Sequence, residues 1–150
     1  MISVQEQDFS VAEEYERLSQ GTESGAIVTF VGKVRDFNEG DDVSGLTLEH
    51  YPGMTEKCLL EIVDEAKSRW PLGQVNVIHR VGAMAPGDQI VYVGVTSAHR
   101  KAAFEAAEFV MDYLKTRAPF WKKERLGNND DRWVEARESD NHAADKWTGN

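Results

Sequence analysis

Apolar residues recur along the chain with two distinct periods, which together predict an ordered set of helices and strands. Apolar positions three to four residues apart in Thr55–Trp70 and Ala98–Lys115 are typical of helices with one buried face. A shorter helix is expected at Asp8–Ser19, where Ser10 and Glu13 have the spacing of a capping box. Strands are predicted where β-branched and other apolar residues gather or alternate: Ala26–Arg35, Leu46–Tyr51, Gln74–Val81, Gln89–Thr96, Phe120–Arg125 and Arg132–Ala136.

Polar segments that contain glycine separate these elements and predict turns and loops. Asp36–Gly45 is expected to be a loop, Ala85–Asp88 a turn, and Gly127–Asp131 a second polar loop. Strand pairs that alternate with single helices favour an α+β fold, with helices packed on mostly antiparallel strands. We expect a single domain over residues 1–138, followed by a flexible C-terminal tail over residues 139–150.

The composition is that of a globular protein and narrows the functional class. The 150 residues are 41% hydrophobic and 29% charged, and no apolar run approaches the ~20 residues needed to cross a bilayer. Residues 1–10 lack the basic start and apolar stretch of a secretory signal, so the cytoplasm is the expected compartment. The net charge of −9 argues against general binding of nucleic acid, because cationic contacts with phosphate supply most of that affinity.

Basic residues nevertheless gather at a few places in this acidic chain. The segment 115–125 reads KTRAPFWKKER and contains five basic residues, whereas the chain average predicts about one. Phe120 and Trp121 in the same segment are expected to form an aromatic wall beside the cations, which suits a planar anionic ligand. The alternative is a solvated helix end, where cations interact favourably with the C-terminal dipole.

Two further basic clusters have the same character. His99 and Arg100 lie in the first turn of a predicted helix, where free backbone N–H groups favour an anion and cations are otherwise unfavourable. Lys33 and Arg35 share one face at the end of a predicted strand. Surface placement is the alternative for the first cluster, and charge protection of an edge strand is the alternative for the second. Together the three clusters predict a pocket for a phosphorylated planar ligand.

Other candidates for chemistry are weaker. The histidines lack metal-ligand spacing, so no metal site is expected, and neither a nucleotide-binding glycine motif nor a nucleophile elbow occurs. His79 alternates with valines and is predicted to be structural. Cys58, the single cysteine, cannot form an internal disulfide and is expected to be buried in a helix. Any sulfur chemistry would therefore need an external sulfur donor.

Four blocks of the sequence resemble one known family. They read VTFVGKVRDFNEGDDVSGLTLEHYPGMTEK, WPLGQVNVIHRVGAMAPGDQIVYVGVTSAHRKAAFEA, MDYLKTRAPFWKKE and DRWVEARESD. In the same order, over roughly residues 9–140, they are similar to the MoaE family, the large catalytic subunits of molybdopterin synthase. The resemblance implies an α/β hammerhead fold with an additional antiparallel sheet.

The resemblance also implies an activity, a substrate and partners. The activity is that of a sulfurtransferase, which moves sulfur from the C-terminal Gly-Gly thiocarboxylate of a small ubiquitin-like (MoaD-like) subunit to cyclic pyranopterin monophosphate. Two transfers form the dithiolene of molybdopterin, and no separate cofactor is implied. The large subunit is expected to be a homodimer within a heterotetramer. The family's substrate-binding segments match here at Lys33, Val34, Arg35, His99, Arg100, Lys115, Lys122, Lys123 and Glu124.

Two lysines are the predicted catalytic residues. Lys115 would act as a general base or stabilise charge at the thiocarboxylate carbonyl, and Lys122 would stabilise developing negative charge. His99 and Arg100, with the helix N-terminus, would hold a phosphate or another anionic group, and Lys33 and Arg35 would add charge. Two alternatives stay open: a non-catalytic adaptor that binds a ubiquitin-like tail in the same channel, and a nucleotide or RNA-binding module that uses Trp121 and the lysines.

Overall fold

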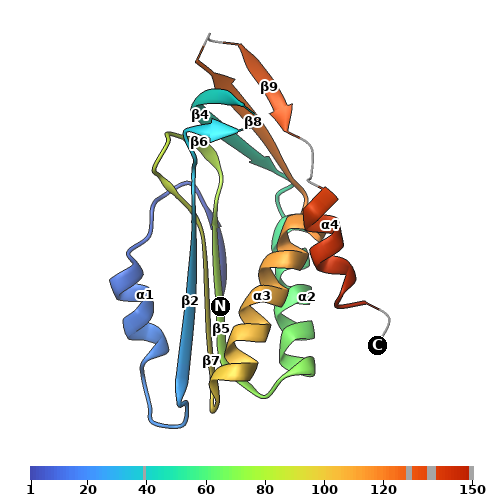
Figure 1. Ribbon diagram of the computed structural model, residues 1–150. Helices are drawn as coiled ribbons and strands as arrows, with labels where there is room; N and C mark the ends of the chain where they lie inside the picture. Colours follow the sequence, from blue (N-terminus) through green and yellow to red (C-terminus); the bar gives the residue numbers. More distant parts are fainter. Residues whose placement is uncertain (39, 128–129, 135–137, 149–150) are drawn as a thin grey trace.

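The computed structural model describes residues 1–38, 40–127, 130–134 and 138–148. Within these residues the chain forms two β-sheets and four helices (Figure 1). The predicted α+β class with mostly antiparallel strands is confirmed, and the two long predicted helices are present. The helices are α1 (Val11–Leu18), α2 (Met54–Arg69), α3 (Arg100–Arg117) and α4 (Glu138–Asp145).

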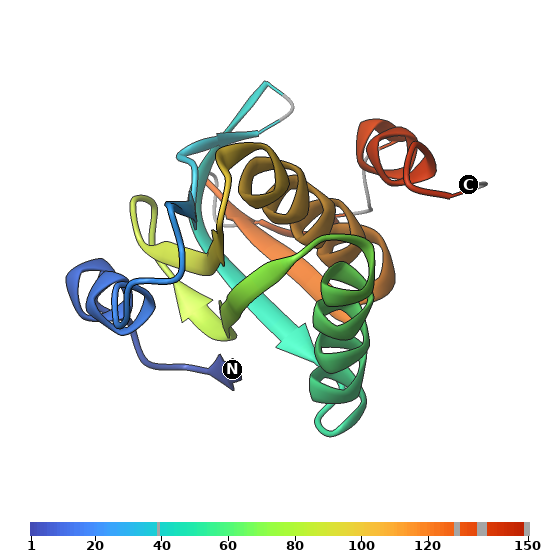
Figure 2. The same cartoon turned by 90° about the horizontal axis from the view of Figure 1, so that it is seen from below.

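The first sheet has four strands and carries helices on both faces. Its strands are β1 (Ile2–Gln5), β2 (Ala26–Lys33), β5 (Leu72–Arg80) and β7 (Gln89–Ser97). They lie in the order β1-β5-β7-β2, and only β1 and β5 are parallel. Helices α2 and α3 cover one face and α1 covers the other, as both views show (Figures 1 and 2).

The main core lies between this sheet and the two long helices. Val77 of β5 and Val93 of β7 are completely buried, and Phe109 and Val110 of α3 belong to the same cluster. Full burial of one such side chain favours folding by about 2 kcal/mol. The apolar face that the sequence predicts for each long helix is therefore the face that packs on the sheet.

Helix α1 approaches the opposite face of the sheet very closely. Leu18 packs there on Ile78 and Tyr92, which are also buried. A Cβ atom added at Gly94 would lie 2.5 Å from Leu18 Cδ1 and 2.6 Å from the Tyr92 hydroxyl. Only glycine allows this approach, which accounts for a glycine in the middle of an apolar strand.

The second sheet is entirely antiparallel within the described residues. Its strands are β3 (Phe37–Asn38), β4 (Asp41–His50), β6 (Gly82–Met84), β8 (Phe120–Leu126) and β9 (Asp131–Val134). They lie in the order β3-β4-β8-β9, and β6 pairs with β4. The expectation of a loop over residues 36–45 is wrong, because β3 and the start of β4 form a tight hairpin. Gly40, with a φ of 84°, lies in the turn between the two strands. The polar composition of the segment had indicated a loop instead of a hairpin.

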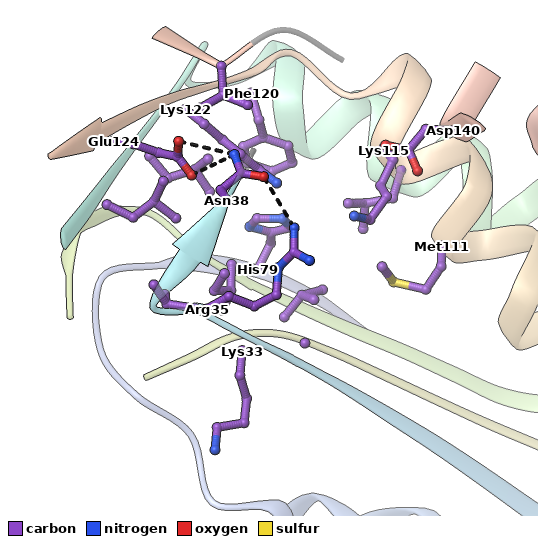
Figure 3. Close-up of a pocket in the computed structure, with 18 of the residues that line it drawn as sticks. Lys33, Arg35, Asn38, His79, Met111, Lys115, Phe120, Lys122, Glu124 and Asp140 are labelled. Carbon is purple, nitrogen blue, oxygen red and sulfur yellow. Dashed lines mark hydrogen bonds between the residues drawn. The ribbon is translucent and has the colours of Figure 1, made fainter. Parts of the chain in front are cut away.

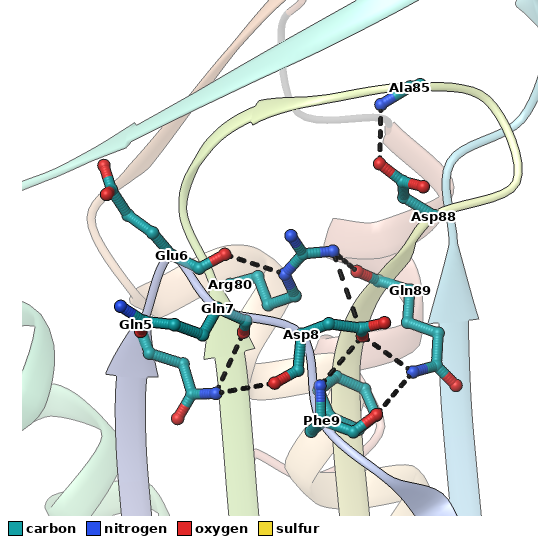
Figure 4. Close-up of polar contacts among 9 residues, drawn as sticks. All are labelled: Gln5, Glu6, Gln7, Asp8, Phe9, Arg80, Ala85, Asp88 and Gln89. Carbon is teal, nitrogen blue, oxygen red and sulfur yellow. Dashed lines mark hydrogen bonds and ion pairs between the residues drawn. The ribbon is translucent and has the colours of Figure 1, made fainter.

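The chain passes from the first sheet to the second just after Arg80, and a polar network holds this junction (Figure 4). The Arg80 guanidinium donates to the backbone oxygens of Glu6, at 3.0 Å, and Gln89, at 2.9 Å. Hydrogen bonds from the Gln89 side chain and the Phe9 N–H lower the pKa of Asp8, with Arg80 adding to the effect. The segment after β1 is thereby tied to β5 and β7.

The C-terminal part of the chain departs from the prediction of a flexible tail over residues 139–150. Helix α4 packs on α3, and the Trp147 ring lies 5.5 Å from Trp70 and 5.6 Å from Phe109, centroid to centroid. Its indole N–H also donates to Asp112 at 2.7 Å. Trp147 therefore attaches the polar helix α4 to α3 and Trp70. Residues 149–150, and residues 135–136 of the predicted strand Arg132–Ala136, lie outside the described part.

Candidate active site

A cavity of about 320 Å³ lies where the two sheets meet, and side chains from both sheets, α3 and α4 surround it (Figure 3). Its volume is in the range of small-molecule sites. Apolar residues such as Phe30, Leu48, Met111 and Phe120 form much of the lining. The polar and charged residues in the lining are Lys33, Arg35, Asn38, His79, Lys115, Lys122, Glu124 and Asp140.

The cavity brings together six of the nine residues that the sequence predicted to bind substrate. These six are Lys33, Val34, Arg35, Lys115, Lys122 and Glu124. They come from the end of β2, the end of α3 and the inner face of β8. A chain with a net charge of −9 thus concentrates four cations around one hollow. Coulombic attraction will favour an anionic ligand there.

Local structure explains how the two candidate catalytic lysines reach the cavity. Lys115 lies in the last turn of α3, where the helix dipole favours a cation. Lys122 lies between Phe120 and Glu124 on the inner face of β8, because alternate residues of a strand point to the same side. Lys33 contributes less, since its amine points away from the other labelled side chains in Figure 3.

A buried polar network fixes the β8 wall of the cavity. Glu124 is 7% exposed, and its carboxylate accepts hydrogen bonds from Asn38 Nδ2 at 2.9 and 3.1 Å and from Arg132 Nε at 3.1 Å. Arg35 in turn donates to Asn38 Oδ1 at 3.4 Å. Glu124 therefore positions Arg35 through Asn38. Neither Asn38 nor this arrangement could be read from spacing along the chain.

His79 forms part of the cavity wall as a buried, neutral imidazole. Its ring stacks on Phe120, with centroids 3.9 Å apart and planes inclined by 19°. Burial lowers the pKa of His79 to about 4, and the charges of Lys122, Lys115 and His50 act in the same direction. His79 Nδ1 lies 2.9 Å from the Arg80 carbonyl oxygen, which can only accept, so Nδ1 carries the proton.

Three residues of the dense basic segment 115–125 do not reach the cavity. Lys123 and Arg125 lie on the outer face of β8 and form ion pairs with Asp131, each at 3.6 Å. Arg117 lies over the Tyr113 ring at 3.7 Å. The prediction that Phe120 and Trp121 both form an aromatic wall is confirmed for Phe120, which lines the cavity. It is wrong for Trp121, which is 48% exposed and absent from the lining. Strand alternation separates these neighbours.

His99 and Arg100 lie at the opposite end of α3 from Lys115. Arg100 and Lys115 are fifteen positions apart on the helix, which corresponds to a rise of about 22 Å. Neither residue lines the cavity of its own chain. The sequence thus identified a charged helix start correctly but could not place it relative to the other clusters.

The described residues contain neither a metal-binding cluster nor a membrane-spanning helix. No group of three or more His, Cys, Asp and Glu side chains is arranged to hold a metal ion. None of the described helices is both long enough and apolar enough to span a bilayer.

Comparison with known proteins identifies the family. The family model described as "MoaE protein" matches residues 4–117. The chain belongs to the MoaE family. Its MoaE relatives include the molybdopterin synthase catalytic subunits of Vibrio cholerae, 68% identical over 146 residues, and Escherichia coli, 67% identical over 146 residues, with 97% of each chain covered in both comparisons.

Solved structures of MoaE proteins have the same fold. The Burkholderia ambifaria MoaE protein is 47% identical, with a TM-score of 0.84 and coverage of 100% of this chain and 99% of that one. Molybdopterin synthase from Staphylococcus aureus is 32% identical, with a TM-score of 0.81 and coverage of 88% and 95%. The fold inferred from the sequence blocks is therefore confirmed over nearly the whole chain.

Proposed function

We propose that this MoaE-family chain is the catalytic subunit of a molybdopterin synthase and acts as a sulfurtransferase. It would transfer sulfur from the thiocarboxylated C-terminus of a small ubiquitin-like subunit to cyclic pyranopterin monophosphate, forming the dithiolene. The observation that carries this proposal is the cavity that gathers Lys33, Arg35, Lys115 and Lys122 in an acidic protein. Relatives at 68% and 67% identity are named molybdopterin synthase catalytic subunits, which supports it.

The cavity lysines have separate roles in this proposal. Lys115 contacts the reacting thiocarboxylate, either as general base or as the group that stabilises negative charge on the carbonyl oxygen. Lys122 stabilises charge that develops on the pterin. Arg35, held by Asn38, binds rather than reacts. The substrate phosphate and the partner's tail are both anionic, so the same cations attract both.

The donor of sulfur is external to the chain. Cys58 is the single cysteine and lies on α2, partly exposed, outside the cavity lining. A structure described as the complex of subunits 1 and 2 of the molybdopterin-converting factor from Helicobacter pylori has the same fold, with a TM-score of 0.72 at 21% identity. We propose a corresponding small partner here, whose C-terminal tail enters the cavity.

Turnover with purified components tests the function directly. The chain, a thiocarboxylated small subunit and the pterin monophosphate are mixed, and mass spectrometry follows product sulfur. We expect a product that has gained two sulfur atoms, with the same yield from the Cys58→Ser variant, because Cys58 does not line the cavity. An adaptor would bind the small subunit and release it with its thiocarboxylate intact. Loss of product only in Cys58→Ser would refute the external donor.

His99 and Arg100 can contribute to the cavity only from a second copy of the chain, given the helix that separates them from Lys115. We propose that the homodimer places these two residues of one protomer beside the cavity of the other, where they bind the phosphate. Each complete site would then combine residues from two chains.

Mixed dimers distinguish this arrangement from a site within one chain. Lys115→Ala and the double variant His99→Ala/Arg100→Ala are each expected to be nearly inactive. When the two are dissociated and reassociated, half the dimers are mixed and one of their two sites is intact. Recovery of roughly a quarter of normal turnover is therefore expected. Recovery no higher than in either parent would contradict a site shared between protomers.

A further inference from the structure

We propose that His79 Nε2 is the hydrogen-bond acceptor that recognises an N–H group of the pterin ring and so fixes the ring's orientation in the cavity. The proposal rests on the proposed function, since it concerns the ligand of the same cavity. It assigns His79 a role in substrate specificity that the sequence pattern, which indicated a structural histidine, did not suggest.

The direction of the acceptor follows from the hydrogen bond on the other side of the ring. Nδ1 donates to the Arg80 carbonyl, so Nε2 carries the lone pair at the opposite edge of the imidazole. No described residue donates a hydrogen bond to Nε2. Because His79 lines the cavity, this free acceptor is available to a ligand.

Two supports prevent the imidazole from turning. The stack on Phe120 fixes the ring plane. The Arg80 carbonyl is fixed because the Arg80 side chain bonds to Glu6, Asp8 and Gln89 (Figure 4). The Val81 N–H of the same peptide unit also donates to the Gln5 carbonyl oxygen at 2.9 Å. The junction network therefore determines which nitrogen of His79 faces the cavity, in the way that outer hydrogen bonds orient functional histidines.

The cavity needs such an acceptor because its charged groups are mainly donors. Lysine and arginine side chains have no acceptor atom. The Glu124 carboxylate is already bonded to Asn38 and Arg132. A pterin ring carries N–H and amino donors, and a donor left without a partner in a closed site costs much of the binding energy. Besides His79, Asp140 of α4 is the charged candidate for this task.

Protonation of His79 would abolish the acceptor, and the surroundings oppose it. Desolvation is the main cause of the lowered pKa of His79. The hydrogen bond to the Arg80 carbonyl raises this pKa by less, and the charges of Lys122 and Lys115 lower it further. The imidazole is thus an uncharged acceptor among cations at neutral pH. A carboxylate in this position would offset part of the cationic field, and another lysine would have no acceptor atom.

A binding cycle with a modified ligand tests the assignment. The complete complex is titrated with the pterin monophosphate and with its counterpart methylated at the ring amide nitrogen. Methylation should weaken binding to the unmodified protein about tenfold or more. His79→Phe keeps an aromatic ring against Phe120 but lacks the acceptor, so it should bind both ligands equally weakly. His79→Gln, whose amide oxygen can take the place of Nε2, should restore part of the discrimination.

Controls separate recognition from folding. Inorganic pyrophosphate, which probes the cations alone, should bind His79→Phe and the unmodified protein within about twofold of each other. The assignment would be overturned if methylation of the ligand weakened binding equally in the unmodified protein and in His79→Phe. It would also be overturned if Asp140→Ala, and not His79→Phe, lost the preference for the unmethylated ligand. If His79→Phe fails to fold, an unmodified protein that binds both ligands equally still overturns it. An unmodified complex that binds pyrophosphate but not the pterin would refute the proposed function itself.

Discussion

Replacement of Lys115 by alanine is expected to lower the rate of sulfur transfer by at least about 100-fold, the usual effect of removing a charge stabiliser or general base. Lys115 is the candidate catalytic residue that α3 delivers to the cavity opposite the β8 wall. The substituted side chain is exposed and lies at a helix end, so the fold should be retained. Single-turnover assays with excess enzyme would measure the chemical step, separately from binding of the small subunit.

Lys101→Ala is the matched control for this experiment. Lys101 lies on the same helix, and its side chain is 88% exposed and only loosely paired with Glu105 at 4.0 Å. Its removal should leave the rate unchanged. A Lys115→Ala protein that turns over at the normal rate would remove Lys115 from the mechanism, and Lys122 would become the principal candidate.

Loss of the Glu124 carboxylate should have the largest effect on stability. Glu124→Ala is expected to lower the free energy of unfolding by about 3 kcal/mol, because it removes a buried carboxylate to which Asn38 and Arg132 both donate. For a chain of this size the melting temperature should fall by about 10 °C. Thermal unfolding followed by circular dichroism provides the measurement.

The same substitution should also weaken binding of the pterin, since Arg35 depends on Asn38 for its orientation. Glu49→Ala is a suitable control, because Glu49 lies on the paired strand β4 but is exposed. It should change stability by less than about 0.5 kcal/mol. Equal melting temperatures for the two variants would mean that the network contributes little to stability.

Periodicity was sufficient for the elements that carry large apolar faces. Helices α2 and α3 and the strands β2, β5 and β7 lie close to their predicted positions, because burial of valine and phenylalanine determines them locally. Strand β1 was missed, since the short segment Ile2–Gln5 gains its order from parallel pairing with β5. Helix α4 was missed for a related reason, because Trp147 and α3 hold a segment with little apolar character of its own.

Local charge counting identified much of the site but not its three-dimensional assembly. It found Lys33, Arg35, Lys115 and Lys122, which the fold brings to one cavity. Charge counting could not show that Lys122 lines the cavity and Lys123 does not. The alternation of side chains along a strand predicts that the two lie on opposite faces, provided that the segment is known to be a strand. Nothing in the sequence indicated that His79 lines the cavity, because a histidine among valines has the same pattern whether or not it borders one.

The tryptophans of this chain form two pairs in different environments. Trp70 and Trp147 contact each other beneath α4, whereas Trp121 and Trp133, 48% and 56% exposed, belong to the outer surface of the second sheet. Intrinsic fluorescence should therefore contain a solvated, constant component and a second component sensitive to detachment of α4. Asp140 of α4 lines the cavity. The tryptophan fluorescence of the unlabelled protein can therefore show whether α4 stays packed beside the cavity while substrate and partner bind.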